Sequence, residues 1–135
     1  MSHALRSRYL TDAVTTASPS ALLIQLCDRL EKDLADAQQA LEHKDLGTAH
    51  ATLVHAQQIV AELHNSLQPD DFSAGRQLAD LYLYAERKLV EANVKKSVAL
   101  VTQCRDLLGP LIDAWRQAAR AAAAATGAGS TRNAS

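Results

Sequence analysis

Aromatic residues, glycine and proline are scarce in this sequence, and each shortage narrows the fold class. Aromatic residues make up 4% of the chain, and there are only 5 glycines and 3 prolines in 135 residues. Strands favour aromatic and β-branched side chains, whereas leucine and alanine, which are abundant here, favour helices. The chain is also long enough to bury one sizeable core. The sequence therefore predicts a single domain of packed helices.

The chain also lacks an excess of positive charge and any long apolar run. Its formal net charge is −1 at pH 7, and charges of both signs are mixed along it, which excludes a basic surface for nucleic acid. Neither the N-terminal segment MSHALRSRYLTDAV nor any later stretch has the apolar character of a signal peptide or a transmembrane helix. We therefore expect a cytoplasmic protein that neither binds nucleic acid nor inserts into a membrane.

The two cysteines, Cys27 and Cys104, form no metal-binding spacing. Each lies among leucine and valine at a position that helical periodicity assigns to a core, so buried free thiols are predicted. Free thiols agree with the reducing conditions of a cytoplasm.

Apolar residues recur at steps of three and four along four segments, each of which predicts an amphipathic helix. The first helix is expected to begin at Ser18-Pro19, a favoured N-cap and first-turn pair, and to run to about residue 41. The others cover about residues 46–67, 74–92 and 98–118. Short connections require consecutive helices to run antiparallel.

The predicted fold is an all-α, antiparallel four-helix bundle with a short N-terminal arm or helix and a disordered C-terminal tail. Residues 1–17 form the arm, residues 18–120 the bundle domain, and the alanine-rich and then polar residues 121–135 the tail. Pro110 falls inside the fourth helix, and because the apolar phase continues across it we predict one kinked helix rather than two. Asp45 and Ser73 are expected to cap the second and third helices, and Asn93-Val94-Lys95-Lys96 is the expected turn before the fourth.

Five histidines raise the question of metal binding or catalysis. No HExxH motif and no cluster of histidine, cysteine and acidic residues at helical spacing is present, so we predict no metal and no cofactor. A phosphotransfer histidine needs a nearby lysine as well as a small residue, and the helix expected to carry His50, His55 and His64 contains no lysine. A di-iron bundle needs Glu-x-x-His pairs, but Glu62 is followed three positions later by Asn65. With no nucleophile–base pair either, we predict that the protein is not an enzyme.

Two of the expected helices carry more apolar residues than one buried stripe needs. The first helix has Leu22, Ile24 and Leu26 beside its main stripe. The third has the run Tyr82-Leu83-Tyr84 and, further along, Leu89-Val90. This surplus either widens the core or forms a groove for an amphipathic helix of a partner, and the residue pattern leaves both interpretations open.

Several short motifs occur in the order and at the spacing of one known family. They are Tyr9, Val14-Thr15-Thr16-Ala17-Ser18-Pro19, Leu22-Leu23, Leu26-Cys27-Asp28, Lys44-Asp45, Ala49-His50, Ala56-Gln57-Gln58-Ile59-Val60, Glu62-Leu63, Asn65-Ser66-Leu67, Leu81-Tyr82-Leu83-Tyr84, Arg87-Lys88-Leu89-Val90-Glu91-Ala92-Asn93 and Asp113-Ala114-Trp115-Arg116-Gln117. Over about residues 8–118, the chain resembles the flagellin-specific export chaperones of bacterial flagella.

The resemblance implies a cytosolic helical-bundle chaperone that binds the disordered C-terminal segment of flagellin. Such a chaperone prevents premature polymerisation and keeps flagellin competent for export, and a component of the export gate is a second candidate partner. In the family the N-terminal arm can lie over part of the client groove, and the resemblance gives that position to Tyr9. The alternative is a helical-bundle adaptor or oligomerising scaffold with no flagellin client.

The surplus apolar residues and the matched motifs together predict a set of partner-binding residues. No catalytic residue and no metal ligand is predicted among them. The predicted set is Tyr9, Leu22, Ile24, Leu26, Cys27, Leu30, Asn65, Leu67, Leu81, Tyr82, Tyr84, Leu89 and Asn93.

Overall fold

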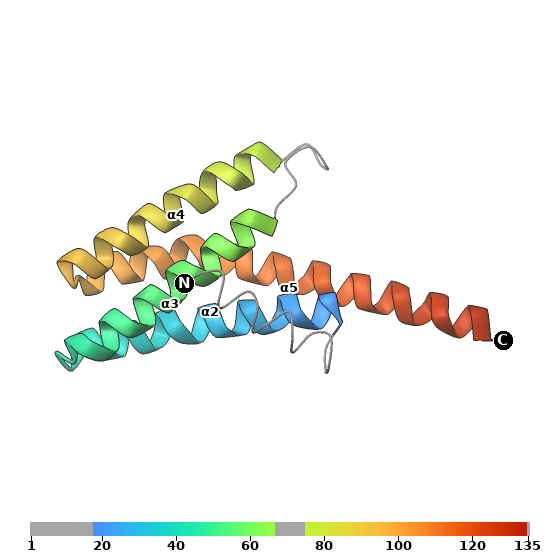
Figure 1. The fold of residues 1–135 in the computed structure, drawn as a ribbon, viewed down its shortest axis with the longest axis horizontal. Helices are drawn as coiled ribbons and strands as arrows, with labels where there is room; N and C mark the ends of the chain where they lie inside the picture. Colours follow the sequence, from blue (N-terminus) through green and yellow to red (C-terminus); the bar gives the residue numbers. More distant parts are fainter. Residues whose placement is uncertain (1–17, 67–74, 135) are drawn as a thin grey trace.

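Helices make up nearly all of the described chain. The computed structural model describes residues 18–66 and 75–134, with side chains described as far as residue 125. Within these ranges, α2 is Pro19–Glu42, α3 is Leu46–Ser66, α4 is Gly75–Lys95 and α5 is Val98–Ala134. Each helix packs against the next one along the chain, and α5 closes the ring against α2 (Figure 1). The predicted all-α four-helix bundle is confirmed.

Side-chain caps set the starts of two helices where the sequence predicted them. The Ser18 hydroxyl accepts a hydrogen bond from the backbone N–H of Ala21 at 3.2 Å, and Pro19 occupies the first turn of α2. Asp45 Oδ1 accepts a hydrogen bond from the backbone N–H of Thr48 at 3.1 Å, and hydrogen bonds from the side chain and the backbone of Thr48 lower the pKa of the Asp45 carboxyl. Each cap satisfies an amide that has no partner within its helix, and removing such a cap costs about 1 kcal/mol.

The turn between α4 and α5 is shorter than the sequence indicated. α4 continues to Lys95, so most of the predicted turn is helical, and Lys96, with φ of 49°, leaves the helical conformation. The Ser97 hydroxyl then accepts a hydrogen bond from the backbone N–H of Leu100 at 3.2 Å and caps α5. A left-handed residue followed directly by a serine cap reverses the chain without a longer loop.

α5 is one continuous helix across Gly109-Pro110, which confirms one helix rather than two, and the kink stays a prediction. A helical conformation before proline is strained because the proline ring meets the Cβ of the preceding residue, and Gly109 has no Cβ. The helix then continues to Ala134, past Arg120, where we expected the bundle domain to end. The high helix propensity of alanine accounts for its continuation through residues 121–125. The disorder of residues 121–135 in solution stays a prediction.

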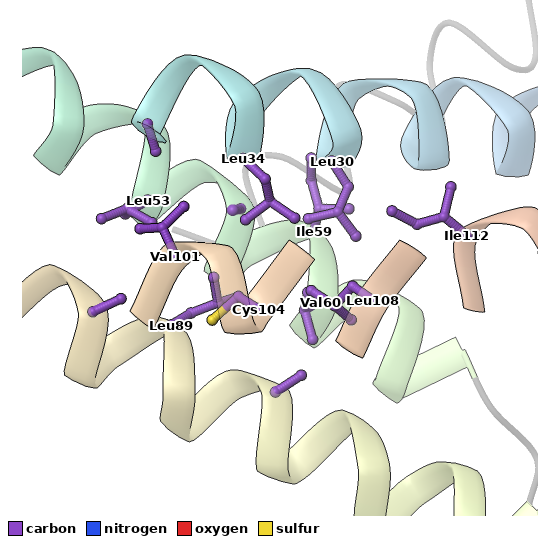
Figure 2. Close-up of a cluster of buried hydrophobic side chains, with 14 of the residues drawn as sticks. Leu30, Leu34, Leu53, Ile59, Val60, Leu89, Val101, Cys104, Leu108 and Ile112 are labelled. Carbon is purple, nitrogen blue, oxygen red and sulfur yellow. The ribbon is translucent and has the colours of Figure 1, made fainter. Parts of the chain in front are cut away.

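One apolar core runs between the helices. Fully burying a leucine, isoleucine or valine side chain contributes about 2 kcal/mol, and buried alanines let the helix backbones approach closely. Both cysteines are buried free thiols, as predicted. Figure 2 shows the core side chains of the four helices meeting: Leu30, Leu34, Leu53, Ile59, Val60, Leu89, Val101, Cys104, Leu108 and Ile112.

The antiparallel order gathers distant parts of the chain at one end of the bundle. The start of α2, the end of α3 and the second half of α5 lie there together (Figure 1). The last turns of α5 extend beyond the other helices at this end. The predicted arm, residues 1–17, and the predicted cap Ser73 lie outside the described residues.

Candidate partner-binding surface

An apolar pocket of about 330 Å³ opens at the end of the bundle where α2 begins. Its walls come from the first two turns of α2, the last turn of α3 and α5 beyond Pro110. Most of the lining residues are leucines, and an apolar pocket of this kind favours an apolar side chain of a partner. The lining residues are Pro19, Leu22, Leu23, Leu26, Leu63, Ser66 and Trp115.

Tyr82 of α4 lies buried beside the pocket and connects three helices. Trp115 Nε1 of α5 donates a hydrogen bond to the Tyr82 hydroxyl. The Tyr82 ring stacks on His64 of α3 with ring centroids 6.1 Å apart. Burial raises the pKa of Tyr82 to about 12, so its hydroxyl stays neutral. Tyr82 therefore holds the pocket wall in place from within the core and offers no surface to a partner in this conformation.

Five of the predicted partner-binding residues are core residues in the structure. Their positions follow the apolar stripes of α2 and α4 that face the bundle axis, where a helix needs its largest apolar side chains. Leu26 also lines the pocket, whereas a partner would reach the other four only if the bundle opened, so their role in binding stays a prediction. These five are Leu26, Cys27, Leu30, Tyr82 and Leu89.

The other predicted residues are scattered over the described surface or lie outside it. Leu22, Ile24, Leu81 and Asn93 are partly exposed, whereas Asn65 and Tyr84 are exposed. Tyr9 and Leu67 lie outside the described residues. Of the whole predicted set, the pocket brings together only Leu22 and Leu26.

The pocket also contains residues that the sequence did not single out for binding. Leu23, Leu63 and Trp115 lie at apolar positions of the three- and four-residue periodicity, which indicates that each side chain faces the core. The available signal was the adjacent pair Leu22-Leu23 at the first turn of α2. Two neighbouring leucines on a helix point about 100° apart, so one of them must face a second neighbour or the solvent.

A second apolar strip runs along the outer face of α4. Leu83, Val90 and Val94 are 41%, 48% and 78% exposed, and their steps of seven and four place them on one side of the helix. Nearby α3 carries no lysine or arginine, and its one acidic residue, Glu62, is buried. On α4 itself the exposed Arg87 lies one turn from both Leu83 and Val90, so this second candidate contact surface is an apolar strip with a charged residue beside it.

Three histidines of α3 bond side chains of the adjacent helices. The contact of His55 is to the buried carboxyl of Asp33. The other two bonds join α3 to α4, and the bond of His50 is exposed whereas that of His64 is partly buried. Within residues 18–66 and 75–134, no group of three or more histidine, cysteine or acidic residues could hold a metal ion. These histidines therefore act as links between helices, and the pairs are His50–Asn93, His55–Asp33 and His64–Glu86.

Among the described helices, none is long and apolar enough to cross a membrane.

Comparisons with known proteins identify the family of this chain. A family model described as flagellar protein FliS matches residues 1–122. The chain is 32% identical over 111 residues to the flagellar secretion chaperone FliS of Bacillus subtilis, which covers 82% of each chain. It is 30% identical over 110 residues to the flagellar secretion chaperone FliS of Salmonella typhimurium, covering 78% of this chain and 79% of that one. The helical bundle described here therefore belongs to the flagellar protein FliS family.

Proposed function

We propose that this protein is a cytosolic export chaperone whose client is the C-terminal segment of flagellin. The apolar pocket between α2, α3 and α5 is the observation that carries the proposal. The two relatives described above are flagellar secretion chaperones, which supports an export chaperone role for this chain. Flagellin as the client, and the pocket as its binding site, go beyond the relatives' names and are the part to be tested.

The chemistry of the pocket fits an amphipathic segment. Leucine side chains and Trp115 line a cavity large enough for one or two apolar side chains of a partner, and Ser66 supplies a polar rim. The apolar face of a free flagellin tail drives its self-association, so covering that face in the pocket delays polymerisation. The strip on α4 offers a second site for a client that extends around the bundle.

The binding strength expected of such a complex is moderate. A client segment that is disordered when free loses conformational freedom on binding, and this cost offsets part of the gain from buried apolar area. Moderate affinity suits a chaperone that must release its client, and a component of the export gate is the partner that we propose receives it.

Titration calorimetry with the purified protein and a peptide of the C-terminal segment of its own flagellin tests the proposal. We expect saturable binding near one to one, with a negative change in heat capacity from apolar burial. Absence of binding heat at several temperatures, with the protein folded, contradicts the flagellin proposal and favours a helical-bundle adaptor or oligomerising scaffold.

Leu23→Glu tests the location of the site. The substitution places a carboxylate in a partly exposed wall of the pocket, so we expect the dissociation constant to rise by roughly tenfold or more. Leu46→Glu is the matched control, because Leu46 is 54% exposed at the start of α3, at the other end of the bundle. Equal affinities of the two variants would contradict the assignment of the pocket.

A further inference from the structure

The second half of α5 follows a weak point in the helix. Pro110 has no N–H, so the carbonyl of Asp106 lacks the donor that an uninterrupted helix provides, and Gly109 adds backbone freedom. Few of the described side chains beyond Pro110 are buried in the bundle. Ile112 and Ala119 are each 3% exposed, whereas Trp115 is partly exposed. The direction of this segment therefore depends on contacts that it makes after the proline.

Arg116 makes the most extensive polar contact of that segment. Its Nε and Nη2 donate to Asp28 Oδ1 at 2.9 and 2.7 Å. Its Nη1 and Nη2 donate to the two carboxylate oxygens of Glu31 at 3.2 and 3.1 Å. A third carboxylate, Asp113 on α5 itself, lies 3.4 Å from Nη1. The planar guanidinium thus joins α5 to two positions of α2 in a fixed orientation, which a single point charge could not do.

The position of this cluster relates it to the pocket. Arg116 directly follows Trp115, whose ring lines the pocket, and Asp28 lies two residues after Leu26 in the opposite wall. The Arg116 side chain is only 14% exposed, although Asp28 and Glu31 are more than half exposed. The cluster therefore links the segments of α2 and α5 that contribute to the pocket walls.

We propose that Arg116 is a positioning residue, which fixes the part of α5 after Pro110 on α2 and thereby holds Trp115 in the wall of the apolar pocket. The link to client binding rests on the proposed function, whereas the effect on Trp115 does not. Arg116 itself touches no client in this proposal. Its role is to compensate, through α2, for the helix hydrogen bond that Pro110 removes.

Arg105 provides a matched control within the same helix. It also reaches from α5 to α2, where Nη1 donates to Gln38 Oε1 at 2.7 Å, but it precedes Pro110. It lies away from the pocket residues. Removing either arginine deletes one positive charge and the contacts of that residue with α2, which are two carboxylates for Arg116 and one amide for Arg105. A difference between the two variants therefore reports the Arg116 cluster rather than general loss of charge.

The free protein gives the first readout, because Trp115 is the single tryptophan of the chain. We expect Arg116→Gln to shift Trp115 emission to longer wavelength and to reduce near-ultraviolet circular dichroism, with helix content retained. Arg105→Gln should leave both signals unchanged. The double variant Asp28→Asn with Glu31→Gln should reproduce the Arg116→Gln spectrum, and it provides the same test if Arg116→Gln does not fold.

The Pro110→Ala background tests whether Arg116 compensates for the proline, because an ion pair with a purely structural role would have the same effect with or without Pro110. Restoring the helix hydrogen bond should make the second half of α5 self-supporting, so Arg116→Gln should change the Trp115 spectrum less in the Pro110→Ala background. An equal change in both backgrounds would overturn the proposed compensation for Pro110.

Calorimetry with the flagellin C-terminal peptide gives the second readout. We expect Arg116→Gln to weaken binding roughly three- to tenfold relative to Arg105→Gln. If the Trp115 spectrum shifts and even the parent protein binds no peptide, flagellin binding fails while the positioning of Trp115 stands. If the parent binds and the two arginine variants have the same spectrum and affinity, the positioning role is overturned. A shifted spectrum with unchanged affinity overturns the link to the client site.

Discussion

At the scale of single residues, Asp33 is the most unusual side chain in the core. It is 1% exposed, yet its carboxyl contacts His55 of α3 and lies 3.3 Å from Arg29 Nε. Burial raises the pKa of Asp33 above its ordinary value of 3.8, and the contacts with His55 and Arg29 offset only part of that rise. A buried pair of this kind fixes how α2 and α3 face each other more than it stabilises the fold.

The raised pKa of Asp33 sets the sign of its effect on stability. The folded state binds this proton more tightly than the unfolded chain, so the resulting stability is fully present below pH 3.8 and is lost as pH rises through the raised pKa. An asparagine at this position would not ionise, so Asp33→Asn removes this pH-dependent loss of stability. The former partners of Asp33, His55 and Arg29, are partly exposed and can bond water instead. We expect the variant to be more stable than the parent near neutral pH, with a smaller difference in acid.

Urea unfolding at several pH values measures this difference. Asp36→Asn is the control, because Asp36 pairs with Lys32 at the surface, where the pair contributes little. A loss of stability in Asp33→Asn that grows toward neutral pH would contradict the assigned sign.

The two thiols are expected to be inert in the folded protein. Burial raises the pKa of Cys27 and of Cys104 to about 11, so almost no thiolate forms near neutral pH. A chromogenic disulfide reagent at about pH 8 should label both only as the chain unfolds. Rapid labelling of either thiol in the native protein, at a rate independent of denaturant, would show that this cysteine is accessible to solvent and would contradict the prediction.

The sequence of α4 contains two apolar stripes and did not distinguish the buried stripe from the exposed one. Tyr82 and Leu89, which were predicted as partner-binding residues, fall on the same stripe as Ala85, and the structure buries all three. Leu83 and Val90 lie about 100° around the helix and are exposed. Both stripes are apolar, and only the position of the neighbouring helices decides which one a partner can reach.

At the scale of elements, Pro110 lowers the stability of α5, and no contact in the apolar core requires a proline at this position. Its side chain is exposed, and an interior proline destabilises a helix by about 3 kcal/mol. We expect Pro110→Ala to stabilise the protein by about 2 kcal/mol, because the helix hydrogen bond to Asp106 is restored. Thermal unfolding measures the gain, and a lower melting temperature would indicate that the proline geometry is needed for packing of α5 on α2.

The helix boundaries show which helix ends can be predicted from residue type. Ser18-Pro19 and Asp45 carry caps that use their own side chains, so both starts could be predicted from residue type. The end of α4 could not, because Lys96 adopts a left-handed conformation without being a glycine. Its ammonium group donates to the Asn93 carbonyl at 2.7 Å and helps to close the turn. That contact exists only once the turn has formed.

At the scale of the whole molecule, the sequence indicated an antiparallel bundle but not its pocket. Hydrophobic periodicity defines four stripes and short connections define the directions of the helices. The pocket joins residues near 19–26, 63–66 and 115, and it depends on α2 lying between α3 and α5. The residue pattern of a single helix does not indicate which helices become its neighbours. The pocket could therefore be predicted only in part, through Leu22 and Leu26.

The most direct test of the central claim is the fluorescence of Trp115 during titration with a tryptophan-free flagellin C-terminal peptide. Trp115 lines the pocket and is the single tryptophan of the chain. If the client occupies the pocket, the emission should shift to shorter wavelength and saturate at the same peptide concentration as the calorimetric heat. Saturable binding by calorimetry that leaves the emission of Trp115 unchanged would place the client elsewhere and contradict the account.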